Sequence, residues 1–120
     1  MNKATPCRKI SHLRPFAVKL STNLLSLKQK TGQMIISGFE GTRLNSQTEK
    51  LISEQGIGGL ILFERNFKNP QQLQILIEDL QSATGKNSPP LFISVDQEGG
   101  RVARLKEPFT QFQQRKIYLH

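Results

Sequence analysis

A chain of 120 residues and 13.6 kDa has room for one small domain. Hydrophobic residues make up 36% and charged residues 22%, an ordinary globular mixture that argues against a fully disordered chain. No apolar run approaches the roughly 18 residues that a membrane-spanning helix requires. A single cysteine, Cys7, excludes an internal disulfide, and the absence of a Cys/His cluster excludes a zinc site. We therefore predict no metal, no cofactor and no membrane span.

The formal net charge of +8 is concentrated at the N-terminus. The first 30 residues carry seven basic groups and no acid, whereas the other 90 carry ten basic and nine acidic groups. We interpret residues 1–24 as a basic, poorly ordered extension. An organelle transit segment and an arm that binds nucleic acid or an anionic membrane surface are the alternatives. Lys19 interrupts the apolar stretch 16–18, which argues against a secretory signal, and we expect a cytoplasmic protein.

The first half of the body contains two predicted helices with a strand between them. A short helix over residues 24–31 ends at Gly32, and a β-rich run follows over residues 34–39. Asn45 or Ser46 can cap a second helix that extends to about residue 55.

The second half contains two apolar strands separated by a helix. Residues 59–63 form a continuous apolar run, and Asn69 then caps a helix with Pro70 in its first turn. The buried face of this helix is marked by Leu73, Leu76, Ile77 and Leu80. Residues 91–95 form the third strand. Short strands without alternation are typical of parallel strands covered on both faces.

The predicted order is β-α-β-α-β, which right-handed crossovers place in one parallel sheet. Two α/β architectures suit this order: an open doubly wound sheet, or the opening portion of a (β/α)8 barrel. In either, ligands collect at the carboxyl ends of the strands, where residues 39–42, 64–66 and 96–101 fall.

The segment after the third strand carries the most chemistry. Asp96 directly follows a buried strand, two glycines allow a tight turn, and Arg101 and Arg104 come next. A carboxylate can accept hydrogen bonds from several hydroxyls and an arginine can donate to paired oxygens, so this cluster suits a polyhydroxylated ligand such as a sugar. The alternative is that Asp96 merely caps a turn and the arginines are solvated.

Three segments together resemble the N-terminal domain of glycoside hydrolase family 3, and within it the bacterial β-N-acetylhexosaminidases. They are residues 30–41, residues 58–66 and the stretch Ser94-Val95-Asp96-Gln97-Glu98-Gly99-Gly100-Arg101-Val102-Ala103-Arg104-Leu105, followed by residues 109–112. The resemblance covers about residues 25–112, in the right order and spacing, and the third segment is its most specific part.

This resemblance implies an incomplete (β/α)8 barrel of an enzyme that removes terminal β-linked N-acetylglucosamine through a covalent glycosyl-enzyme, in cell-wall or carbohydrate turnover. It implies that Asp96 and Arg104 bind the sugar. The family's nucleophile is an Asp on a much later strand, and its acid/base is a His in a loop with a Lys-His-Phe-Pro-Gly type motif. Neither element occurs in this sequence, so we predict no catalytic residue here.

Two further expectations follow from the length. The similarity ends after Phe112, residues 113–120 diverge, and we expect a truncated product, inactive alone and with an exposed strand edge for association or aggregation.

Asp96 and Glu98 share a face of an extended segment and are an alternative carboxylate pair, although the family gives neither that role.

The competing hypothesis is a small non-catalytic α/β binding module whose basic arm recruits a polyanion. Seven Phe, one Tyr and no Trp leave few aromatic rings for base stacking, so we expect no nucleic acid partner. The family resemblance implies a carbohydrate partner that contains N-acetylglucosamine.

Overall fold

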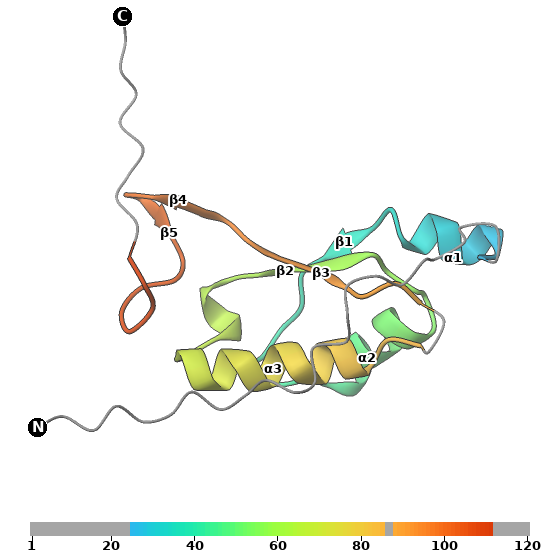
Figure 1. Ribbon diagram of the computed structural model, residues 1–120, viewed down its shortest axis with the longest axis horizontal. Coiled ribbons are helices and arrows are strands. Elements are labelled where there is room, and N and C mark those ends of the chain that lie inside the picture. Colours follow the sequence, from blue (N-terminus) through green and yellow to red (C-terminus); the bar gives the residue numbers. More distant parts are fainter. Residues whose placement is uncertain (1–24, 86–87, 112–120) are drawn as a thin grey trace, which may run out of the picture.

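The computed structural model describes residues 25–85 and 88–111 (Figure 1). The two expectations for the basic N-terminal segment, residues 1–24, and for the divergent tail, residues 113–120, lie outside the described residues.

Three α-helices begin at side-chain caps that the sequence specifies. α1 (Leu27–Gly32) starts with a capping box, α2 (Ser46–Ser53) follows the N-cap Asn45, and α3 (Pro70–Ser82) follows the N-cap Asn69. Each cap oxygen accepts a hydrogen bond from a backbone N–H in the first turn that has no partner within the helix. The predicted starts of α2 and α3 are confirmed, whereas α1 begins three residues later than expected.

The sheet is parallel, with strand order β1-β2-β3, formed by β1 (Ile36–Ser37), β2 (Gly59–Leu62) and β3 (Phe92–Val95). The predicted β-α-β-α-β order is therefore confirmed. β1 spans only two of the six residues that the sequence predicts as a strand. Beyond it, the carbonyls of Phe39 and Gly41 accept hydrogen bonds from the side chain of Asn66.

The hydrophobic core lies between this sheet and two helices that cover the same face of it (Figure 1). Leu60 and Leu62 of β2 point toward this layer and are 0% and 3% exposed. The core side chains are Phe39, Ile52, Ile57, Leu60, Leu62, Phe67, Leu76, Leu80 and Leu91. Successive right-handed crossovers in a sheet whose strands follow chain order place both helices on one face.

The opposite face of the sheet is uncovered among the described residues. Ile36, Gly59 and Phe92 are aligned across the three strands, and the side chains of Ile36 and Phe92 are 53% and 62% exposed. Among the described residues, only one of the two faces that the apolar strands were expected to bury is covered. We call the face that carries Ile36 and Phe92 the open face.

Two elements were not predicted as regular structure. Residues Glu64–Asn66 form a single 3-10 turn, η2, directly after β2. Beyond β3, a two-stranded antiparallel hairpin of β4 (Gln97–Gly99) and β5 (Val102–Ala103) projects away from the helical layer (Figure 1). No helix in the described residues is both long and apolar enough to cross a bilayer.

Candidate functional site

The carboxyl ends of the three parallel strands share one edge of the sheet. Phe39 and Glu40 follow β1, the η2 turn follows β2, and Asp96 follows β3. In β3 the side chains of Phe92 and Ser94 belong to the open face, because Phe92 is aligned with Ile36 and Gly59 there. Because alternate side chains of a strand share one face, Asp96 is the next residue after Ser94 on the side of the open face, and it is half-buried.

The β4–β5 hairpin returns the chain from Asp96 to Arg104. Gly99 and Gly100 occupy its turn with φ of 84° and 58°, a backbone region that residues with a Cβ adopt only at a cost. The ladder pairs Gln97 with Ala103 and Gly99 with Val102, with an irregularity between the two pairs. The two glycines singled out in the sequence therefore have a conformational role, which is to reverse the chain so that Arg104 follows β5.

Arg104 is half-buried, and its Nε is buried without a hydrogen-bond partner among the described residues. Buried polar nitrogens in native proteins are nearly always hydrogen-bonded, so an unpaired guanidinium nitrogen at this edge of the sheet calls for an explanation. Asp96 does not supply one, because the ion pairs of the described region do not join Asp96 to Arg104. Both predicted site residues lie at the same edge of the sheet, and they form no ion pair with each other among the described residues.

An ion pair connects the end of β2 with the segment after the hairpin. The ammonium of Lys106 donates a hydrogen bond of 2.5 Å to the carboxylate of Glu64. This bond and the charge of Lys106 hold the pKa of Glu64 below its usual value, and burial opposes the shift. The charge of Arg104 lowers the pKa of Glu64 further, so Arg104 lies close enough to the end of β2 to act on it.

The ends of β1 and β2 are joined by the side-chain amide of Asn66, which is completely buried. Its Nδ2 donates to the carbonyl oxygens of Phe39 at 3.0 Å and Gly41 at 2.9 Å, and its Oδ1 accepts from the backbone N–H of Phe63 at 2.9 Å. Gln72 extends this link from α3, since its Nε2 donates to the carbonyl of Thr42 at 2.6 Å. Two amide side chains thus fix the loop that follows β1.

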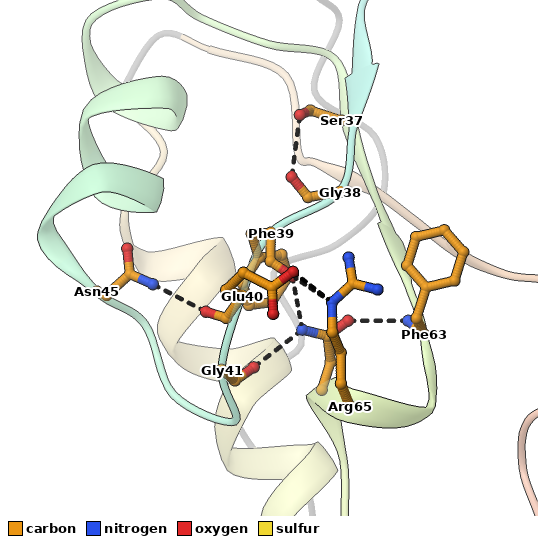
Figure 2. A network of polar contacts seen from close by, with 9 residues as sticks. Ser37, Gly38, Phe39, Glu40, Gly41, Asn45, Phe63 and Arg65 are labelled. Atoms are coloured by element: carbon orange, nitrogen blue, oxygen red, sulfur yellow. Dashed lines mark hydrogen bonds and ion pairs between the residues drawn. The ribbon is translucent and has the colours of Figure 1, made fainter.

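Arg65 forms a second contact between the ends of β1 and β2, where it lies close to Glu40 (Figure 2). Its Nε pairs with a carboxylate oxygen of Glu40 at 2.9 Å, and its guanidinium lies 4.6 Å from the centre of the Phe63 ring. The Arg65 and Glu40 side chains are 45% and 79% exposed, so this pair is a solvated bridge and contributes little to folding.

The sequence predicted all three strand ends, but it indicated binding residues only in the segment after the third strand. It named the segment that contains Asn66 without recognising the buried amide, and it gave Gln97 no role. Both are polar residues within four positions of the end of an apolar strand, and this position was the available signal. Glu98 is exposed on β4, beside the half-buried Asp96. The described residues include no group of three His, Cys, Asp or Glu side chains that could hold a metal ion.

A parallel sheet with both crossover helices on one face and charged groups at its carboxyl edge defines an α/β protein of the kind that binds ligands at that edge. The family model described as the glycosyl hydrolase family 3 N terminal domain matches residues 26–116. The chain belongs to this family.

Relatives and solved structures agree with this assignment. A beta-hexosaminidase of Alkalilimnicola ehrlichii is 47% identical over 77 residues, which are 64% of this chain and 21% of the relative. A beta-hexosaminidase of Haemophilus ducreyi is 42% identical over 78 residues, 65% of this chain and 22% of the relative. The chain therefore spans about a fifth of the length of the curated relatives it matches.

Two solved structures are similar to the described fold. A glycoside hydrolase family 3 beta-N-acetylglucosaminidase from Paenibacillus matches with a TM-score of 0.71 and 42% identity, covering 75% of this chain and 17% of that protein. NagZ from Neisseria gonorrhoeae, solved in complex with N-trifluoroacetyl-D-glucosamine, matches with a TM-score of 0.59 and 37% identity, covering 66% of this chain and 22% of NagZ.

Proposed function

We propose that this chain forms the opening β-α-β-α-β portion of a family 3 glycoside hydrolase barrel and carries part of a binding site for terminal β-linked N-acetylglucosamine. In this proposal Asp96 accepts hydrogen bonds from ring hydroxyls, and Arg104 donates to oxygens of the same sugar. The observation that carries the proposal is the buried Nε of Arg104, which has no partner in the described residues at the edge where Asp96 lies.

The strand order β1-β2-β3, with the core on one face, suits both the opening portion of a barrel and the first half of a doubly wound sheet. The barrel is favoured because the chain belongs to glycosyl hydrolase family 3, and resemblance to this family implies a (β/α)8 barrel. The small side chains of the open face, Gly59 and Ser94, alternate with larger ones as in the layered interior of a (β/α)8 barrel.

Sugar binding is tested by titrating the 15N-labelled chain with N-acetylglucosamine. We expect shift changes confined to the backbone amides of Asp96, the hairpin and Arg104, and their loss in Asp96→Ala. Asp79→Ala, on the exposed side of α3, is the control and should leave the response unchanged. Changes spread evenly over the domain, or a response that survives in Asp96→Ala, would refute the assignment.

We further propose that the 120-residue polypeptide does not hydrolyse glycosides by itself. Retaining hydrolysis needs a nucleophile and an acid/base on the two sides of the scissile bond, and the residues that the family uses for these steps have no counterpart in this sequence. Incubation with a chromogenic N-acetylglucosaminide should release no product. Turnover that disappears in Asp96→Ala or Glu98→Ala would overturn this statement and favour the carboxylate pair.

A further inference from the structure

The side chain of Gln97 binds the backbone of the segment after β5 as a neighbouring strand would. Its Oε1 accepts hydrogen bonds from the backbone N–H of Arg104 at 2.7 Å and of Leu105 at 3.0 Å. Its Nε2 donates to the carbonyl oxygen of Leu105 at 3.3 Å. One amide group therefore satisfies three backbone groups, beyond the point where the β4–β5 ladder ends at Ala103.

Gln97 is the chain neighbour of Asp96, and Arg104 is its hydrogen-bond partner. The β4–β5 ladder brings the backbones of the two predicted sugar-binding residues together as far as Ala103, and beyond that point the Gln97 side chain holds the backbone of Arg104. Without it, Arg104 would be the first residue past a two-residue strand and its backbone would have no fixed partner on this side.

We propose that Gln97 is a positioning residue, which sets the distance between Asp96 and Arg104 and thereby pre-organises the sugar site. This inference rests on the proposed function. An arginine side chain loses considerable rotamer freedom on binding, and a fixed backbone removes part of that cost before the ligand arrives. Gln97 itself touches the protein backbone through its amide, so it acts through Arg104.

The test uses the full chain and three variants. Gln97→Ala removes all three hydrogen bonds. Gln97→Glu keeps an oxygen that can accept from Arg104 and Leu105, but it loses the donor to the Leu105 carbonyl and adds a negative charge. Gln111→Ala is the matched control, because Gln111 also donates to the Leu105 carbonyl, at 3.1 Å, but makes no bond to Arg104.

Two quantities are measured by NMR on each protein. The first is the hydrogen-exchange rate of the Arg104 amide relative to the amides of the β2–β3 ladder. The second is the dissociation constant for N-acetylglucosamine, from the shift changes at Asp96. In Gln97→Ala we expect Arg104 exchange to rise and sugar binding to weaken, each roughly tenfold, as the loss of one or two hydrogen bonds allows. Gln97→Glu should restore the Arg104 protection, and Gln111→Ala should match wild type.

The two proposals fail in different ways. Absence of sugar-dependent shifts in the wild-type chain refutes the proposed function, and Arg104 exchange still decides whether Gln97 fixes that backbone. Unchanged Arg104 exchange in Gln97→Ala overturns the positioning role. Equal sugar affinity in Gln97→Ala and wild type also overturns it, as does an equal loss of protection throughout the β2–β3 ladder, which would mark a general loss of structure.

Discussion

The buried amide of Asn66 donates to the backbone carbonyl of Phe39 at 3.0 Å, across 27 positions of sequence. Phe39 belongs to the loop after β1, and Asn66 ends the η2 turn after β2. Since β1 has only two residues in the ladder, this side chain does at the carboxyl edge what strand pairing does elsewhere in the sheet. The edge that carries the charged groups is therefore held by specific polar contacts.

Replacing Asn66 by alanine should destabilise the domain strongly. The change removes the partner of the Phe63 N–H and of the Gly41 carbonyl, both partly buried, and leaves the buried Phe39 carbonyl only a long hydrogen bond of 3.4 Å from Arg65 Nε. We therefore expect a loss of about 2–4 kcal/mol in the free energy of unfolding. Denaturant titration measures it. Asn69→Ala, which removes only the N-cap of α3, should cost about 1 kcal/mol. Equal losses in the two variants would contradict this account of Asn66.

A methyl group at Gly59 should not fit between β2 and β3. An ideal Cβ there would lie 2.5 Å from the backbone carbonyl oxygen of Phe92, which cannot move without breaking the ladder. We expect Gly59→Ala to lower the free energy of unfolding by about 3 kcal/mol, at the upper end for overpacking. Gly38→Ala is the control. A Cβ at Gly38 would lie 3.3 Å from the nearest atom, which belongs to the ring of Phe63, and that side chain can shift. Thermal or urea unfolding compares the stability of the two variants. A larger loss of stability in Gly38→Ala would show that β2 and β3 can move apart to admit the methyl group.

The carboxylate of Glu64 should titrate below its ordinary range, as measured by 13C NMR of its side chain. The hydrogen bond and charge of Lys106 are the larger causes and the charge of Arg104 is the smaller. Lys106→Gln should therefore raise the pKa of Glu64 more than Arg104→Gln does. The reverse order would mean that Arg104, and not Lys106, is the main partner of Glu64.

The lowered pKa of Glu64 also gives a pH dependence of stability. A carboxylate whose pKa is lower in the folded chain than in the unfolded chain stabilises the fold above the unfolded value, here 4.5. This contribution is lost as the pH falls from that value through the folded pKa. Wild type should therefore lose stability relative to Glu64→Gln when the pH falls below 4.5, and added salt should diminish the difference because both partners are exposed. A constant difference across this range would contradict the ion pair.

The open face should promote self-association of the isolated chain. Phe92 and Ile36 expose apolar surface beside strand edges that have no partner in the described sheet. Sedimentation velocity should detect oligomers of the wild-type chain at high concentration, and Phe92→Ser should reduce them. Ile75→Ser is the control, since Ile75 is 59% exposed but lies on α3. A wild-type chain that remains monomeric would exclude this role for the open face.

Local signals in the sequence predicted most of the fold. Asn45, Asn69 and Pro70 mark helix starts because a cap needs only the residue and the first turn that follows it. The parallel order of the strands followed from their apolar runs and the helices between them. The uncovered face could not be predicted this way, because a continuous apolar strand has the same composition whether one or both of its faces are covered.

The sequence by itself determined the family and the order of the elements, and it predicted Asp96 and Arg104 as sugar-binding residues. Only the tertiary structure decided how these residues are held. Asn66 and Gln97 act on backbone atoms that lie 27 and seven positions away, and hydrogen bonds of that kind depend on distances that no local pattern encodes. For the same reason, only the fold placed the charges of Glu64, Arg104 and Lys106 at one edge of the sheet.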